Sequence, residues 1–274
     1  MMSETSTTDV TDGAAPRPAD SVRSVALLIA MVAQVAAGAV GGIGVWGEQI
    51  GTVANSYPTP LLPGGGAFAI WSLIYVSTLA LAVRAALPAQ RGRRVYRRAG
   101  WWLVAAGVLN AGWVLVFGQR WIAFAEVVIV ALLICLIMAW VRLTETPARD
   151  WGDRLLLYTP VTFYAGWVTM ATVVGAATTV TALGLRLSAG LTASVAVAAV
   201  LATTAVVTLV VINAFAVFGF VASVTWALAW IVLTTSTGLV AVAALVGIVV
   251  TLSAVAVRYK GSAAAGRRLR IGWG

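Results

Sequence analysis

One segment of the chain, residues 109–117, combines an amide with large aromatic side chains in an otherwise apolar stretch. Asn110, Trp113 and Phe117 are spaced three and four residues apart, so a helix would present them on one face. The stretch around them is apolar enough to lie in a lipid bilayer, where a buried polar group is costly unless something pairs with it. Asn110 therefore marks this segment as a candidate ligand-binding element.

We expect three other apolar segments to bring similar side chains to a similar depth in the membrane. The segments are residues 67–87, 122–141 and 155–177, and the depth lies between the first helical turns below the outer surface and mid-membrane. A layer of aromatic rings with a few hydrogen-bonding groups suits a flat, amphipathic ligand. The residues of this predicted ligand-binding layer are Phe68, Trp71, Tyr75, Asn110, Trp113, Phe117, Glu126, Tyr164 and Trp167.

Each of these residues also has a simpler interpretation. Tryptophans fill space in membrane bundles, and a buried amide such as Asn110 often serves only to join two helices. Glu126, the only acidic residue inside a predicted span, is either an interfacial residue hydrated from the outer surface or a group that binds ligand or carries a proton. The sequence leaves these alternatives open.

The composition excludes several classes of protein. With 61% hydrophobic and 10% charged residues, the chain is predicted to be an all-α integral membrane protein. It has no histidine and one cysteine, which excludes disulfide frameworks, Cys/His zinc sites and a haem held by histidine. We predict no metal or cofactor. The net charge of +9 comes from basic residues in short connections, so it reports topology and not a nucleic-acid partner.

The chain contains eight apolar segments of about 20 residues, each long enough to cross a bilayer. Residues 1–23, rich in Ser, Thr, Asp and Pro, predict a disordered N-terminal tail, and residues 259–274 predict a basic cytoplasmic tail. The predicted spans are residues 24–46, 67–87, 100–118, 122–141, 155–177, 191–211, 215–234 and 239–257.

The distribution of basic residues predicts the orientation of these spans. If the N-terminus is cytoplasmic, only Arg120 and Arg186 of the 18 basic residues fall outside, which leaves sixteen inside. Such a bias is typical of membrane proteins, whose cytoplasmic loops are enriched in Lys and Arg. We therefore predict a multi-pass protein of a bacterial inner membrane with both termini in the cytoplasm.

Four motifs in the predicted layer, one per span, resemble those of a known family. Asn110-Ala111-Gly112-Trp113 is similar to the third-helix Asn-x-x-Trp motif of the translocator protein, or tryptophan-rich sensory protein (TspO), family. Trp71-Ser72-Leu73-Ile74-Tyr75 is similar to its second-helix Trp-x-Leu-x-Tyr motif. The others are Ala125-Glu126, which resembles the acidic start of the fourth helix, and Trp167-Val168-Thr169-Met170-Ala171, which resembles the fifth-helix Trp-Val-Ser/Thr-x-Ala motif.

The resemblance implies a five-helix TspO-like membrane domain over residues 24–180, with residues 181–258 as a three-helix extension in a divergent branch. It also implies a pocket, capped by the loop between the first two spans, that binds a tetrapyrrole such as a porphyrin or haem, a sterol-like lipid or another hydrophobic molecule, often in a homodimer. Two departures concern the ligand: Pro63-Gly64-Gly65-Gly66 replaces Pro-Pro-Gly-Trp, and Gly175 replaces an asparagine.

The function predicted from these observations is membrane-embedded binding, sensing or transport of a hydrophobic or flat aromatic small molecule. One alternative is a proton-coupled secondary transporter that uses Glu126, although the sequence shows no internal repeat. The other is a porphyrin-degrading membrane protein that uses Trp71 or Trp113. Without histidine or paired carboxylates we expect no ordinary enzyme, and only weak porphyrin photochemistry stays open.

Overall fold

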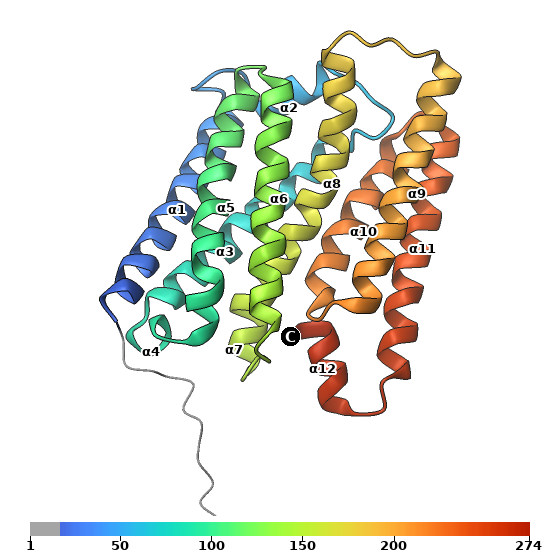
Figure 1. Ribbon diagram of the computed structural model, residues 1–274. Coiled ribbons are helices and arrows are strands. Elements are labelled where there is room, and N and C mark those ends of the chain that lie inside the picture. The colour runs from blue at the N-terminus through green and yellow to red at the C-terminus, as the bar shows by residue number, and fades with distance from the viewer. Residues whose placement is uncertain (1–16) are drawn as a thin grey trace, which may run out of the picture.

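The computed structural model describes residues 17–274 as helices and loops (Figure 1). Eight helical segments in this range are long and apolar enough to cross a membrane, which confirms the all-α class and the predicted count. The long helices are α1 (Pro18–Ile43), α3 (Ile70–Ala86), α5 (Arg94–Gly118), α6 (Ile122–Thr144), α8 (Thr159–Ala182), α9 (Ala189–Asn213), α10 (Val217–Thr234) and α11 (Gly238–Gly261). The short ones are α2 (Ile50–Asn55), the 3₁₀ helix η1 (Gly65–Ala69), α4 (Pro88–Arg91), α7 (Trp151–Asp153), the π-helical turn η2 (Arg154–Tyr158) and α12 (Ala265–Trp273).

The first helix begins earlier than the sequence predicted. Residues 1–16 of the predicted disordered tail lie outside the described residues, but α1 starts at Pro18 and not at residue 24. Pro18 suits a first helical position because the N–H that it lacks would have no helical partner there. The Asp20 carboxylate accepts a hydrogen bond of 3.0 Å from the backbone N–H of Arg17, and this interaction caps the helix.

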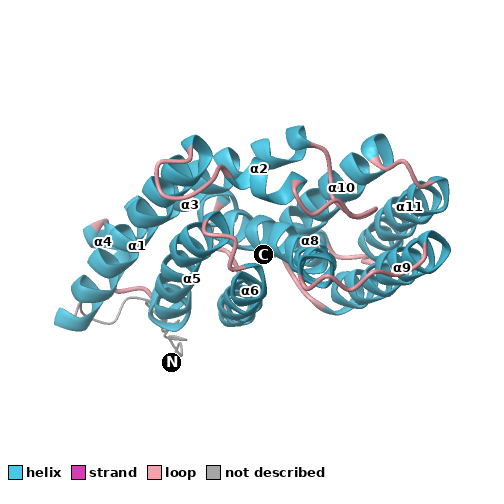
Figure 2. Cartoon of the chain, turned by 90° about the horizontal axis from the view of Figure 1, so that it is seen from above, coloured by secondary structure: helices cyan, strands magenta, loops and turns pink. Residues whose placement is uncertain are grey.

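The helices form an elongated bundle when seen from above (Figure 2), with α1 towards one end and α9 and α11 at the other. Helix α5 packs between α1 and α6, and α8 packs against both α6 and α10. Helix α9 packs mainly on α11, which also contacts α10. Helix α8 is therefore the shared wall between the first five spans and the last three.

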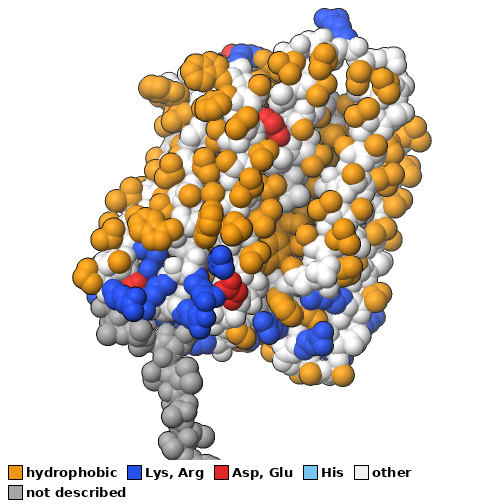
Figure 3. Space-filling model, viewed as in Figure 1, with side chains coloured by type: hydrophobic (Ala, Val, Ile, Leu, Met, Phe, Trp, Pro, Cys, Tyr) orange, Lys and Arg blue, Asp and Glu red, His pale blue; other side chains and the backbone are white. Residues whose placement is uncertain are grey.

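The two ends of the bundle differ in charge. Basic side chains gather at the end where the chain enters α1 and leaves α12, below a broad hydrophobic surface (Figures 1 and 3). We call this the basic end, and the opposite end, formed by residues 44–64, 119–121, 183–188 and 235–237, the distal end. Both described chain ends lie at the basic end, as an even number of spans requires. The assignment of this end to the cytoplasm stays a prediction.

Ion pairs hold the basic end together. Two buried aspartates, in α1 and α7, each bind two arginines, which join α1 to α5 and α7 to α3 and the start of α5. These pairs, with N–O distances of 2.6–2.8 Å, are Asp20 with Arg23 and Arg97, and Asp153 with Arg84 and Arg93.

The C-terminal segment, predicted as a cytoplasmic tail, contains the docked helix α12. Ile271 is buried, and the Trp273 ring lies 5.2 Å from the Phe218 ring of α10 and 5.8 Å from the Trp151 ring of α7. The backbone N–H of Ala216 also donates to the carbonyl of Arg270 at 3.0 Å. Helix α12 therefore caps the basic end of the bundle.

Candidate ligand-binding site

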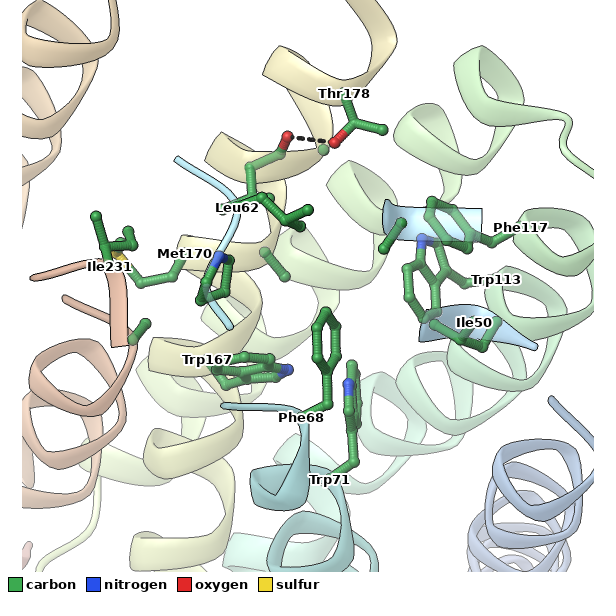
Figure 4. Close-up of a pocket in the computed structure, with 16 residues that line it drawn as sticks. Ile50, Leu62, Phe68, Trp71, Trp113, Phe117, Trp167, Met170, Thr178 and Ile231 are labelled. Carbon is green, nitrogen blue, oxygen red and sulfur yellow. Dashed lines mark hydrogen bonds between the residues drawn. The ribbon is translucent and has the colours of Figure 1, made fainter. Parts of the chain in front are cut away.

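A cavity lies in the distal half of the bundle, between α3, α5, α8, α10 and the loop that carries α2. The space between its lining residues is about 590 Å³ with the open mouth included, but the centre of a water molecule can move through only about 60 Å³ of it, which is well below the volume of typical small-molecule sites. Aromatic side chains occupy much of the remaining room (Figure 4). Five of the predicted ligand-binding residues line this cavity: Phe68, Trp71, Trp113, Phe117 and Trp167.

Trp71 is the centre of the aromatic cluster. Its ring stacks on Tyr75 at 5.6 Å and on Trp113 at 5.9 Å, and meets Tyr164 and Trp167 edge to face at 6.0 and 6.1 Å. These are the preferred geometries for aromatic pairs. The cluster joins α3, α5 and α8, so a ligand that inserts between two of these rings would displace the contacts of several helices.

The cluster continues at both sides of Trp71. Trp113 stacks on Phe117 at 5.0 Å, one turn closer to the distal end of α5. Phe68, which lies in η1, meets Trp167 edge to face at 6.3 Å. Rings that come from the same helix therefore lie on one side of it, as their spacing in the sequence predicts. Phe68, from η1, completes the cluster.

Three predicted residues lie behind the cavity wall in a buried polar layer. The Tyr75 hydroxyl donates to Asn110 Oδ1 at 3.4 Å, and the Tyr164 hydroxyl donates to Oε1 of Gln34 in α1 at 3.5 Å. Gln34 Nε2 in turn donates to the Thr78 hydroxyl at 2.8 Å. Gln34 is fully buried and was missed by the sequence analysis, although an amide inside an apolar span is the same signal that identified Asn110.

Two donors in this region have no hydrogen-bond acceptor among the described residues. They are Asn110 Nδ2 and Trp167 Nε1, both buried. Rotating the Asn110 amide by 180° exchanges its oxygen and nitrogen and still leaves one of them unpaired. An unsatisfied buried donor costs about 1–3 kcal/mol. Trp167 lines the cavity, with its indole nitrogen on the side of Phe68 (Figure 4), so a ligand acceptor placed there would recover this cost.

Glu126, the ninth predicted residue, lies beside the cavity and does not line it. It is half-buried in α6, and its Oε2 lies 2.2 Å from where a Cβ on Gly175 would be. Gly175 does line the cavity. The absence of a side chain at residue 175 therefore lets the carboxylate pack directly behind the cavity wall.

Helix α10 contributes residues that the sequence analysis did not assign to the site. Ala227 and Ile231 line the cavity, and the Trp226 indole donates to the carbonyl of Ala67 at 3.0 Å. A Cβ on Gly66 would lie 2.2 Å from the Trp230 ring, so Gly66 is packed against α10, whereas a Cβ on Gly65 would meet nothing within 4 Å. Trp226 and Trp230 share one face of α10 at i and i+4, and this spacing was the available signal.

The loop between α1 and α3 is anchored on its other side by an ion pair. Arg120 binds both carboxylate oxygens of Glu48, at 2.5 and 2.7 Å, and the backbone N–H of Glu48 donates to the carbonyl of Gly118 at 2.9 Å. The Arg120 guanidinium holds the pKa of Glu48 below its usual value. The loop over the cavity is therefore tied to the α5–α6 turn as well as to α10.

The eight spans define an integral membrane protein, and the aromatic-lined cavity between them is its candidate ligand-binding site. The sequence matches a family model described as TSPO-like protein over residues 22–257, so the chain belongs to this family. The membership supports a membrane-embedded role in ligand binding or sensing. No curated protein and no solved structure matches the chain. The family match includes all eight spans, and the division into domains at residues 180 and 181 stays a prediction.

Proposed function

We propose that the cavity binds a flat, largely apolar molecule that carries a hydrogen-bond acceptor. Tetrapyrroles such as porphyrins and haem, and sterol-like lipids, are the first classes to test. The observation that carries this proposal is the buried, unpaired N–H of Trp167 in a wall made of aromatic rings. Such a wall stabilises a ring system by stacking, and the single donor would set its orientation.

Binding of a molecule of this size requires the cavity to widen, because only about 60 Å³ is open to the centre of a water molecule. The groups that would separate are the stacked rings of Trp71 and Trp113 and the loop above them. A ligand that binds only the widened state shifts the population of the protein towards that state. This link between occupancy and conformation favours a sensing role.

The test is a titration of the purified protein with protoporphyrin, haem and a sterol, followed by quenching of tryptophan fluorescence. Replacing Trp71 by Leu should weaken the preferred ligand about 5–100-fold, which corresponds to the roughly 1–3 kcal/mol of a central aromatic contact. Trp101→Leu is the matched control, because Trp101 is 52% exposed and does not line the cavity. Equal affinities for the two variants would refute the cavity as the binding site.

A second candidate function is proton-coupled transport, and the position of Glu126 against Gly175 favours it. A carboxylate behind the cavity wall could exchange a proton as the ligand moves. In reconstituted vesicles under a pH gradient, uptake that is lost in Glu126→Gln would support this function, because an amide cannot carry the proton. Ligand binding without uptake in the unmodified protein would favour binding and sensing.

We also propose that the ligand is bound and not converted. The residues that line the cavity include no carboxylate, cysteine or histidine, so the wall offers no nucleophile with a neighbouring base. Trp71 and Trp113 leave weak photochemistry as the alternative. Bound porphyrin should therefore be recovered intact after incubation in the dark, and its loss in the dark at more than one equivalent per protein would overturn this proposal.

A further inference from the structure

A second hollow lies between α8 and α9, on the opposite face of α8 from the cavity. Its α8 wall includes Thr172, Ala176 and Val180, whereas the cavity is lined by the intervening positions of the same helix, among them Val174 and Thr178. It encloses about 1150 Å³, and the centre of a water molecule can move through about 480 Å³ of it. Helices α8 and α9 follow each other in sequence but pack mainly on other helices, and residues 58–61 of the loop between α1 and α3 complete the lining. We expect this hollow to be a groove that opens to the membrane.

The groove is lined mainly by small and apolar groups. Thr59, in the loop between α1 and α3, borders it with a buried hydroxyl that has no hydrogen-bond partner among the described residues. Four more threonines border it on α8 and α9. Each of these hydroxyls donates to the carbonyl four residues earlier in its own helix, at 2.7–3.2 Å, which leaves the methyl groups for the groove. The four are Thr172, Thr181, Thr192 and Thr203. The α8 and α9 walls, whose threonine hydroxyls are already satisfied, require no hydrogen bond from an occupant and therefore fit a hydrocarbon chain.

The length of the groove also fits a hydrocarbon chain. Along α9 its lining runs from Thr192 to Thr203, which is about 16 Å of helix. One leaflet contributes about 15 Å of hydrocarbon to a bilayer core of about 30 Å. An acyl chain that enters from the distal end therefore matches the groove.

A positive charge lies at the distal end of this groove. Arg186 is exposed in the turn between Leu185 and Leu187, which both line the groove. In the described part of the chain no carboxylate pairs with Arg186, whereas Arg120, also at the distal end, is bound by Glu48. The free charge would sit at the level of the lipid headgroups, where a phosphate is its natural partner.

We propose that the groove binds one phospholipid of the leaflet at the distal end, with an acyl chain between α8 and α9 and its phosphate paired with Arg186. The apolar walls hold the chain, and the arginine selects an anionic headgroup. This site is separate from the aromatic cavity, and the proposal does not depend on the ligand of that cavity.

The experiment is native mass spectrometry of the full-length purified protein titrated with dimyristoylphosphatidylglycerol. We expect one tightly retained lipid per chain. Ala199→Phe fills the groove and should weaken retention more than tenfold, whereas Ala198→Phe, at a neighbouring exposed position outside the groove, should change it less than twofold. Arg186→Gln should weaken retention about fivefold, as expected for one basic residue near the membrane surface. Equal melting temperatures would show that the variants remain folded.

Three results would overturn the proposal. The first is equal retention by Ala199→Phe and Ala198→Phe, which would place the lipid elsewhere. The second is displacement of the lipid by glycerol phosphate, which would mean that Arg186 binds a phosphate without using the groove. The third is a dimer that dissociates in Ala199→Phe while lipid retention is unchanged, because the groove would then hold a second copy of the chain.

Discussion

The basic end and the distal half of the bundle bury polar groups with different kinds of partner. At the basic end, Asp20 and Asp153 are each paired with two arginines. In the distal half, Asn110 and Trp167 keep buried donors without acceptors among the described residues, inside a cluster of aromatic rings. Both buried carboxylates at the basic end are therefore paired, although the Nε of Arg84 has no acceptor among the described residues, whereas the distal donors lie where a ligand could supply one.

The difference follows from the forces involved. A buried ion pair is costly to break because the remaining charge is left without compensation. Aromatic contacts contribute about 0.5–1.5 kcal/mol each beyond their buried area, and a displaced ring can form similar contacts with a ligand. We therefore expect the basic end to be the more rigid part of the bundle and the distal half to be the part that adapts to a ligand.

The largest expected effect concerns the topology, that is, the side of the membrane to which each end of the bundle is exposed. Reporter fusions at Gly274 and within residues 183–188 should give opposite, all-or-none signals, with Gly274 in the cytoplasm, because the two positions lie at opposite ends of the bundle. A cytoplasmic reporter such as green fluorescent protein and a periplasmic one such as alkaline phosphatase make the measurement. The same side for both positions would contradict the eight-span topology.

Removing a buried carboxylate should affect stability more than any change in the cavity. Asp153→Ala leaves Arg84 and Arg93 buried without their partner, so we expect a loss of about 3–5 kcal/mol in the free energy of unfolding, measured by denaturation in bicelles. The control is Glu145→Ala, which removes a half-exposed partner of Arg98 and Arg142 and should cost less than about 1 kcal/mol. Similar losses in both variants would argue against a rigid basic end.

The contact between α10 and the loop over the cavity should have an intermediate effect. A Cβ added by Gly66→Ala would collide with Trp230, and we expect a loss of about 1–3 kcal/mol, together with faster ligand release because the loop is displaced. At Gly65 a Cβ meets nothing within 4 Å, so Gly65→Ala is the matched control. If Trp230→Leu fails to relieve the effect of Gly66→Ala in the double variant, the predicted collision is not its cause.

Removing the unpaired donor should separate stability from binding. Trp167→Phe eliminates a buried N–H that has no partner, so stability should stay within about 1 kcal/mol, while affinity for an acceptor-bearing ligand should fall about 5–10-fold. A ligand of the same shape without the acceptor should bind both proteins equally. If both ligands lose affinity to the same extent, the indole acts by packing alone.

The smallest effect is a pH dependence of the loop. Arg120 lowers the pKa of Glu48, so the ionised pair stabilises the loop at neutral pH. This contribution begins to fall as the pH drops below 4.5, the usual pKa of a glutamate, and is lost as the pH passes through the lower pKa in the folded protein. Amide exchange in residues 44–64, corrected for its intrinsic pH dependence, should become less protected over this range, and Glu48→Gln should remove the change. An unchanged pH profile in Glu48→Gln would assign the effect to another group.

The spans were predictable from the sequence because a bilayer requires long apolar segments whatever their packing partners. Even the last three spans, which have no charged residue between Arg186 and Arg258 to mark their turns, were identified by length. Helix α12 was not, because its arginines indicate a solvated tail, whereas tertiary contacts such as the packing of Trp273 against Phe218 determine its position.

The candidate site was predicted in part. The i, i+3 and i+7 spacing predicted that Asn110, Trp113 and Phe117 share one face of a helix, and Trp113 and Phe117 both line the cavity. The spacing could not show that Asn110 lies behind the rings, since a small rotation of α5 decides between the two positions. The contribution of α10 was missed for a related reason. Lipid and protein interior are equally apolar, so hydropathy does not reveal which face of a membrane helix meets its neighbours.

Helix α10 contacts structures at both ends of the bundle, which the resemblance to a five-helix family did not predict. Towards its distal end Trp226 and Trp230 contact residues 66 and 67, which precede α3 beside the cavity. Near its other end Phe218 packs on Trp273 of α12. One continuous helix therefore connects the cavity with the basic end of the bundle. If the proposed ligand displaces the segment that covers the cavity, α10 would transmit that displacement to α12 at the basic end, and the protein could signal occupancy there.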